Sequence, residues 1–373
     1  MKTINTVAFL LILLASSCLV RGQARQTGID TLVMKLGETF MNDQQAVGLS
    51  IGVYNNGEVS FYNFGTIEKG KAIQPTQNTV YEIGSVTKAF VSLILANAVI
   101  EKKVNLNDDI RKYLHGHYPN LEYAKKPITV EQLANTTSGL PNWLPATPKE
   151  ITNAPADSSA FLRDRIYGSY TEKDFYTALR KVELDTIPGF KTRHSNAAAQ
   201  LLTYILEKVY ATSIDNLVKK YVLEPNKMDN TSFLASASNS KSLAMGYDGK
   251  GNKMPYFTTQ YMKGVGGLNS TTADLMKFIK LQLDKKDDAI SLTQKRSFDA
   301  GYYSIGLSWL KYKHDNGKHQ VWTDGGTYGF VSYIVFYPEI NSGVVLLSNI
   351  ADDSTPGKLG NIAYQLFELM QRQ

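Results

Sequence analysis

The sequence predicts an α/β protein in which strands from both ends of the chain form one sheet, with a mostly helical lobe inserted between them. Strand-like patterns occur at residues 47–64 and return from Tyr303 onward. Residues 102–288 instead show helical spacing and irregular polar connections. The 373 residues are 43% hydrophobic and 20% charged, which is typical of a globular protein with a large core.

These patterns divide the chain into segments of one overall domain. We predict a signal peptide at 1–22, an α/β lobe made of 23–101 and 289–373, and a helical lobe at 102–288. A cleft between the two lobes is the expected place for a functional site.

The N-terminal segment has the order of a secretory signal: Lys2, an apolar run over residues 7–14, then small residues. The run is shorter than the roughly 20 residues of a membrane-spanning helix, so we expect no transmembrane helix after signal removal. Cleavage near Gly22 is favoured, giving a periplasmic or extracellular protein. Lipidation at Cys18 is the alternative, and the apolar Leu19-Val20 that follows argues against it.

Charge and cysteine content exclude several kinds of protein. The 40 Lys and Arg residues barely exceed the 34 Asp and Glu residues, and no dense basic run is present, so nucleic-acid binding has no support. A single cysteine excludes an intrachain disulfide framework and a cysteine-based zinc site. We expect no metal and no organic cofactor.

Local patterns predict the first elements in order. Residues 28–41 form a polar, helix-like lead. Two β-rich runs, 47–54 and 58–64, meet at an Asn-Asn-Gly turn and predict a hairpin. From Ser85 onward, the run VTKAFVSLILANAVIEKK is apolar almost all round and contains no Gly or Pro, which predicts a buried helix with Ser85 at its start.

The later elements follow the same logic. Helical spacing is present in VEQLANTTSGLPNW, EKDFYTALRKV, NAAAQLLTYILEKVY, SIDNLVKKYV and TADLMKFIKLQL. Strand patterns return in SIGLSWLKY, QVWTDGG, FVSYIVFYPEI and SGVVLLSNI, before the amphipathic helix KLGNIAYQLFELMQ.

Ser85-Val86-Thr87-Lys88 is the strongest candidate for chemistry. Residues three apart on a helix share a face, so the Lys88 ammonium can approach the Ser85 hydroxyl, and burial would lower the lysine pKa towards that of a usable base. The helix N-terminus would stabilise negative charge that develops near Ser85. The same S-x-x-K spacing recurs at Ser238 and Ser308, and a serine cap followed by an incidental lysine is the alternative reading.

Around this tetrad the chain resembles the serine β-lactamase, penicillin-binding protein and esterase superfamily, in particular its class C-like branch. The resemblance runs from about residue 47 to 349. Five blocks follow the family order: YEIGSVTKAFVSLILANAVIEKK, ITVEQLANTTSGLP, PGFKTRHSNAAAQLLTYILE, GVGGLNSTTADLMKFI and TDGGTYGFVSYIVFYPE. The resemblance implies a β-lactamase/transpeptidase-like fold with an antiparallel sheet and a serine nucleophile at Ser85.

The chain departs from the family pattern at three positions. His194 stands where the family has the tyrosine of Y-x-N, and Ser195 and Asn196 follow as expected. Thr323 replaces the Lys or His that opens the third motif. Thr136 replaces a further histidine before T-S-G-L.

An imidazole can take over acid–base work from a tyrosine. The ordinary pKa of tyrosine is about 10, whereas that of histidine is about 6.5 and already suits proton transfer near neutral pH. We therefore expect Ser85 to attack a carbonyl while Lys88 and His194 share its proton, with His194 later protonating the leaving group. A decayed site in which His194 only packs is the alternative.

The third motif bears on substrate charge and on the oxyanion hole. Loss of a cation at Thr323 and the negative charge of Asp324 disfavour substrates with a carboxylate, such as penicillins, and favour neutral esters or amides. Gly325 and Gly326 allow close approach of the backbone to substrate. The resemblance implies an oxyanion hole formed by the N–H groups of Ser85 and Gly326, with Asn196 orienting Lys88 and the acyl group.

Other residues are weaker candidates. His115 and His117 lie in a polar loop without metal-site spacing. Trp143 and Tyr328 are expected to form walls of the cleft.

The main hypothesis is an exported serine hydrolase that forms an acyl-enzyme at Ser85 on a small-molecule or peptide ester, amide or lactam, and esterase, amidase or peptidase activity is favoured over efficient β-lactamase activity. One alternative is a non-catalytic envelope binding protein that uses the same cleft. Another is an acyltransferase or transpeptidase, in which an amine accepts the acyl group. The sequence does not indicate the oligomeric state.

Overall fold

A computed structural model describes residues 28–233 and 242–372 of the chain. The predicted signal peptide with Cys18 lies outside the described residues, as does the second S-x-x-K copy at 238–241. In the parts that are described, no helix is long and apolar enough to cross a bilayer.

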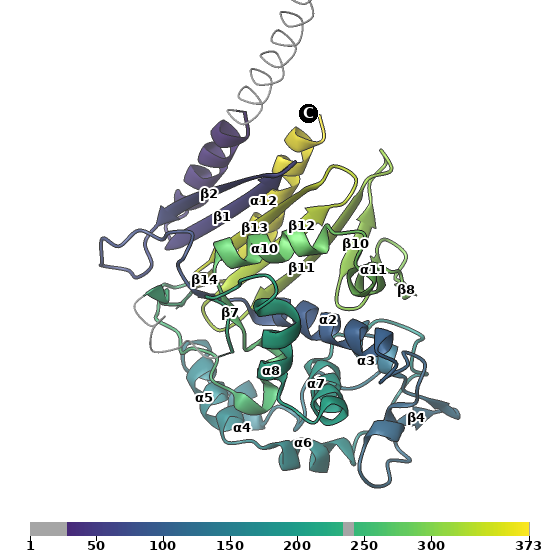
Figure 1. Cartoon of the computed structure of the whole chain (residues 1–373). Helices are drawn as coiled ribbons and strands as arrows, with labels where there is room; N and C mark the ends of the chain where they lie inside the picture. Colours follow the sequence, from purple (N-terminus) through teal and green to yellow (C-terminus); the bar gives the residue numbers. More distant parts are fainter. Residues whose placement is uncertain (1–27, 234–241, 373) are drawn as a thin grey trace, which may run out of the picture.

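The centre of the molecule is an eight-stranded antiparallel sheet in the order β2-β1-β13-β12-β11-β10-β9-β8 (Figure 1). Its strands are β1 (Gly48–Asn55), β2 (Glu58–Gly65), β8 (Phe298–Asp299), β9 (Ser304–Ile305), β10 (Leu310–Lys313), β11 (His319–Gly326), β12 (Val331–Tyr337) and β13 (Ser342–Ser348). Early strand β1 pairs with late strand β13, Leu49 lying opposite Ser348. The sheet therefore draws on both ends of the chain, as predicted.

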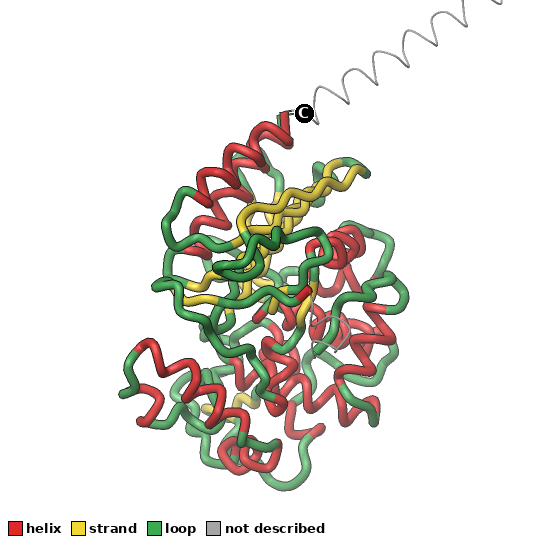
Figure 2. The backbone as a smooth tube through the Cα atoms, turned by 90° about the vertical axis from the view of Figure 1, so that its left-hand side faces the viewer, coloured by secondary structure: helices red, strands yellow, loops and turns green. Residues whose placement is uncertain are grey.

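Most helices lie below the sheet in Figure 1, and the tube view shows the same mostly helical part in red (Figure 2). The α-helices are α2 (Thr87–Ile100), α3 (Val130–Ala134), α4 (Lys149–Thr152), α5 (Ala156–Gly168), α6 (Glu172–Leu179), α7 (Asn196–Tyr210), α8 (Ile214–Val218), α9 (Lys263–Gly266), α10 (Thr272–Gln282), α11 (Asp288–Gln294) and α12 (Thr355–Met370). Helices α10 and α12 instead pack on the sheet. Residues 28–41 are also helical.

Short elements connect these parts. They are β3 (Tyr81–Glu82) paired with β7 (Asn269–Ser270), β4 (Glu122–Tyr123) paired with β5 (Lys126–Pro127), β6 (Tyr247–Asp248) paired with β14 (Ile350–Ala351), and the single turns η1 (Gly84–Val86), η2 (Ile110–Tyr113), η3 (Lys219–Leu223) and η5 (Gln260–Met262).

The predicted hairpin of β1 and β2 is confirmed. Asn55 pairs with Glu58, and the two residues between them have positive φ angles of 50° at Asn56 and 105° at Gly57. Two-residue turns with both φ angles positive match the right-handed twist of the strands, which explains the Asn-Gly sequence there.

Side chains of the sheet alternate between two cores. In β12, Val331, Tyr333 and Val335 pack with helix 28–41 and α12, whereas Ile334 and Phe336 join the core shared with α2 and α10. This period of two is the geometry of a strand that is covered on both faces. The apolar composition of β12 and β13 follows from that double burial.

Helix α10 packs on a different part of the fold from the one that the predicted lobe boundary gives it. The prediction placed residues 102–288 in the helical lobe, but α10 packs against β1 and β13 of the sheet. Phe278 of α10 stacks on Phe90 of α2 with ring centroids 4.0 Å apart. The α10–α2 contact thus joins the sheet to the helix that begins next to Ser85.

Candidate active site

Ser85 lies in the single turn η1 directly before α2, and this turn contacts β11 and β12 of the sheet and α9 of the helical part. The turn requires glycine at position 84, where φ is +49° and an added Cβ would lie 2.7 Å from the backbone nitrogen of Gly326. An added Cβ at Gly325 would lie 2.6 Å from the backbone nitrogen of Ser85. The end of β11 therefore packs backbone to backbone against the nucleophile turn.

Lys88 contacts the Ser85 hydroxyl directly. Its Nζ lies 2.6 Å from Ser85 Oγ and 3.1 Å from the carbonyl oxygen of Val265. Both Ser85 and Lys88 are partly accessible, whereas most of the other side chains of α2 are buried. The three-residue spacing thus brings the two groups together on one face of the turn, as the sequence predicts.

The protein environment changes the protonation of both basic candidates. Burial lowers the pKa of Lys88 to about 7, against the opposing effect of the negative charge at Asp324. Burial also lowers the pKa of His194, and the nearby positive charge of Lys88 acts in the same direction. A neutral amine and a neutral imidazole are thus both available near neutral pH.

His194 lines the same pocket as Ser85 and Lys88, and this pocket has a volume of about 360 Å³. The Nδ1 atom of His194 lies 3.1 Å from Asn142 Oδ1. No hydrogen bond joins His194 to Ser85, although both residues are described. The structure therefore places His194 near the nucleophile, while its role as a base remains a prediction.

The third-motif residues also lie at this pocket. Thr323, Asp324, Gly325 and Gly326 line it from the end of β11. Asp324 is accessible from the cleft, and the surrounding protein raises the pKa of its carboxyl group against the opposing effect of Lys88. Lys88 is the only lysine, and no arginine is present, among the described residues that line the pocket.

Asn196 is the predicted site residue that does not line the pocket. It is the first residue of α7 and is 6% exposed. Its Oδ1 atom is buried without a hydrogen-bond partner in the described part of the chain, and its backbone N–H donates to Asn142 Oδ1 at 3.2 Å. Ser195 caps the helix by accepting from the backbone N–H of Ala198.

Four pocket residues were not among the predicted site residues, although the sequence analysis named Thr136 and Ser308 for other reasons. Thr136, Ile305, Ser308 and Leu310 complete the lining. Ser308 belongs to an S-x-x-K copy that the sequence offered as incidental, and its Oγ lies 2.7 Å from Ser92 Oγ. No sequence pattern indicated a role for Asn142, which follows the T-S-G-L block, because its hydrogen-bond partners His194 and Asn196 lie more than 50 residues later.

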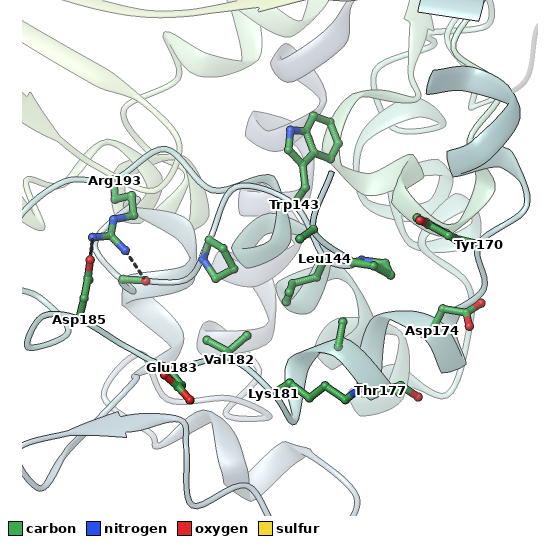
Figure 3. A pocket seen from close by; sticks show the side chains of 15 residues that line it. Trp143, Leu144, Tyr170, Asp174, Thr177, Lys181, Val182, Glu183, Asp185 and Arg193 are labelled. Carbon is green, nitrogen blue, oxygen red and sulfur yellow. Dashed lines mark hydrogen bonds and ion pairs between the residues drawn. The ribbon is translucent and has the colours of Figure 1, made fainter. Parts of the chain in front are cut away.

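Figure 3 shows a second, larger pocket of about 600 Å³, whose lining residue Arg193 directly precedes His194 of the nucleophile pocket. Trp143 and Leu144 supply apolar surface, and Arg193 bridges Asp185 and the carbonyl oxygen of Gly139. The expected wall residue Trp143 thus lines this neighbouring pocket rather than the one that contains Ser85. Tyr328 lines neither of the two and lies near Phe257, with ring centroids 6.3 Å apart.

Solved structures share this fold. A class C β-lactamase superposes with a TM-score of 0.78 at 20% identity, covering 91% of this chain and 96% of that chain. A β-lactamase/D-alanine carboxypeptidase from Yersinia pestis, solved in complex with citrate, superposes with a TM-score of 0.77 at 24% identity, covering 91% and 98%. The protein therefore has the β-lactamase/transpeptidase-like fold.

The chain belongs to the beta-lactamase family, whose profile matches residues 33–367. Protein flp of Staphylococcus aureus (strain MRSA252) is 29% identical over 356 residues, which cover 91% of this chain and 66% of that protein. The chain thus spans slightly less than two thirds of the length of this relative. A β-lactamase of Yersinia enterocolitica is 26% identical over 364 residues, covering 86% of this chain and 87% of that protein. The family is one of serine hydrolases.

Proposed function

We propose that the protein is an exported serine hydrolase that forms an acyl-enzyme at Ser85 on neutral ester, amide or lactam substrates. The observation that carries this proposal is the 2.6 Å contact between Lys88 Nζ and Ser85 Oγ, at a lysine whose pKa is lowered to about 7. A neutral lysine can accept the serine proton without a histidine relay.

The acylation step balances with groups already present. Lys88 takes the proton of Ser85 as Oγ bonds to the carbonyl carbon, and the resulting ammonium returns that proton to the leaving group. This scheme gives to Lys88 the protonation of the leaving group that the sequence analysis expected of His194. The backbone N–H groups of Ser85 and Gly326 would stabilise the oxyanion. The close packing of Gly325 against the Ser85 nitrogen supports this arrangement, because it brings both backbones to one place.

Substrate charge follows from the residues of β11. With Thr323 in place of a cation and Asp324 beside it, a substrate carboxylate would meet a negative charge instead of a partner. Esters and amides without a carboxylate near the scissile bond are therefore the proposed substrates. Penicillins, which carry that carboxylate, should react less well.

Intact-protein mass spectrometry with a fluorophosphonate probe tests the proposal. We expect one adduct on the wild-type protein, none on Ser85→Ala, and at least about 100-fold slower labelling of Lys88→Ala. Peptide mapping must place the adduct on Ser85 rather than on Ser308 of the same pocket. Folded wild-type protein that remains unlabelled would contradict the proposal and favour the binding-protein alternative.

Product analysis with a neutral activated ester separates hydrolysis from acyl transfer. Release of the free acid, unchanged by added amines, supports a hydrolase. Diversion of most product to the amide by millimolar amine would instead identify an acyltransferase or transpeptidase.

A further inference from the structure

A dense set of hydrogen bonds joins residues 136–142, which contain the T-S-G-L block, to residues 189–197, which lead into and begin α7. Backbone N–H groups of Gly189 and Arg193 donate to the carbonyls of Thr137 and Thr136, and Ala197 N donates to the carbonyl of Asn142. Two side chains also donate hydrogen bonds to carbonyl oxygens. Ser195 Oγ donates to Pro141 O at 2.7 Å, and Arg193 Nη1 donates to Gly139 O at 3.1 Å. The two segments thus form one wall that lines both pockets: Thr136 and His194 line the nucleophile pocket, and Gly139, Pro141 and Arg193 line the pocket of Figure 3.

Asn142 lies at the centre of this wall and contacts His194. Its Oδ1 atom lies 3.2 Å from the backbone nitrogen of Asn196 and 3.1 Å from His194 Nδ1. A backbone N–H can only donate, so the side-chain atom that faces it must be the amide oxygen. An amide oxygen can only accept, so His194 Nδ1 must carry the proton.

We infer that Asn142 is a positioning residue that holds His194 in its Nδ1–H tautomer, which leaves Nε2 as a proton acceptor for the water that releases the acyl group. This inference rests on the proposed acyl-enzyme at Ser85. In a neutral imidazole with Nδ1 protonated, the lone pair is on Nε2. The backbone N–H of Asn196 therefore fixes the orientation of the Asn142 amide, and that amide in turn fixes the tautomer of His194.

Release of the acyl group from Ser85 needs only water and the imidazole of His194. His194 Nε2 takes a proton from water as the water oxygen bonds to the acyl carbon. The bond between that carbon and Ser85 Oγ then breaks, and the imidazolium gives the proton to Oγ. Ser85 and neutral His194 are both regenerated.

The charged groups around His194 come from three elements. Lys88 of α2 and Asp324 of β11 line the same pocket. Arg193 precedes the histidine, but its guanidinium is bound to Asp185 and to the carbonyl oxygen of Gly139, which line the pocket of Figure 3. Lys88 lowers the pKa of His194 in addition to the effect of burial. Asn142 itself is neutral, so its replacement by Asp adds one charge at a defined atom.

Nitrogen NMR of ¹⁵N-histidine-labelled protein tests the tautomer independently of activity. The chain has five histidines, so the spectrum of His194→Gln assigns the signal. We expect Nδ1 protonated and Nε2 unprotonated at pH 8 in the wild type, and a mixture or the reverse in Asn142→Leu. Nε2 protonated in the wild type, or an unchanged tautomer in Asn142→Leu, would overturn the inference.

Kinetics of acyl release supply the second readout. Asn142→Leu should slow release of an acyl group by at least about 10-fold while fluorophosphonate labelling of Ser85 changes much less. Asn142→Asp retains both hydrogen bonds and should move the pH midpoint of release upward by about one unit or more, because a carboxylate favours imidazolium. An Asn142→Asp midpoint equal to that of the wild type would contradict the assignment.

Ser195→Ala is the matched structural control. It removes the bond to Pro141 O and the cap of α7 in the same wall, and neither of these bonds involves the His194 side chain. We expect a lower melting temperature but the wild-type tautomer and pH midpoint. If Ser85 never acylates, the proposed function fails while the NMR result still decides the role of Asn142.

Discussion

The pKa of Lys88 controls acylation at the residue scale. Because burial lowers this pKa to about 7, the neutral amine that can accept a proton becomes the major form above that pH. The rate constant of fluorophosphonate labelling should therefore rise with pH and level off above about 7 to 8. Lys88→Arg keeps the positive charge at every pH and should be at least about 100-fold slower. A wild-type rate that is constant from pH 5.5 to 9 would exclude Lys88 as the base.

Asp324 is predicted to select against anionic substrates. Asp324→Asn removes the negative charge from the pocket and should increase kcat/KM for a carboxylate-bearing ester several-fold relative to its methyl ester. Thr323→Lys places a cation at the neighbouring position and should increase the same ratio further. The comparison of paired substrates within each variant controls for differences in folding. An unchanged ratio in both variants would show that the substrate carboxylate does not reach β11.

Residue-scale predictions from sequence succeeded where the partners are neighbours along a helix and failed where they are distant. The Ser85–Lys88 contact follows from a three-residue spacing. The bond between Asn142 and His194 joins residues 52 positions apart, and nothing in either local pattern indicates it. The burial of Asn196 is likewise set by how α7 packs, which its sequence does not specify.

At the element scale, the contact between η1 and the end of β11 depends on glycine. An added Cβ at Gly325 would lie 2.2 Å from the carbonyl oxygen of Ile83 and 2.6 Å from the nitrogen of Ser85, which only a backbone shift can relieve. Gly325→Ala should therefore reduce labelling of Ser85 by about 10-fold or more, because small displacements of the reacting groups are costly. Gly301→Ala is the control, since no atom lies within 4 Å of its added Cβ, although its own φ of +86° adds some strain. Equal labelling of the two variants would argue against this contact.

Glu82 in β3 makes the stability of the site region depend on pH. It is 4% exposed, its Oε1 accepts from the backbone N–H of Phe257 at 2.6 Å, and burial raises its pKa from 4.5 to about 7. The protonated form is thus favoured by folding, so its stabilising effect is complete below pH 4.5 and is lost as pH rises through about 7.

Glu82→Gln should remove this dependence. The difference in unfolding free energy between pH 5 and pH 8 should be smaller than in the wild type by an amount on the order of 3 kcal/mol. Urea unfolding at the two pH values measures it. Identical pH dependence of the two proteins would show that Glu82 is not the responsible group.

At the scale of elements, periodicity predicted which segments are helices and strands but not which surface each helix covers. The hairpin of β1 and β2 and the start of α2 follow from local turn chemistry and apolar runs. Helix α10 shows the same spacing as the helices of the other lobe, yet it packs on the sheet. Its partner surface is decided by long-range contacts such as the stack of Phe278 on Phe90.

At the scale of the whole molecule, the sheet and the helix 28–41 form a layered unit with α12. Leu359, Ile362 and Leu366 of α12 belong to the same core as Ile29 and Val33 of the first helix. Removal of residues 355–373 should therefore expose the apolar face of β12 and β13 and abolish cooperative thermal unfolding, because burying that surface provides the main stabilising free energy. Scanning calorimetry of the truncated and full chains checks this, and a single sharp transition in the truncated protein would contradict it.

The pairing of β1 with β13 also constrains how the chain can fold during synthesis. Leu49 cannot pair until Ser348 has been synthesised. The edge of the β1–β2 hairpin that pairs with β13 therefore stays unpaired until nearly 300 further residues have been made. For that time its apolar side chains and unpaired edge are exposed to other chains, a condition that promotes aggregation. Export in an unfolded state, which is part of the proposed function, would postpone this search until the whole chain is present.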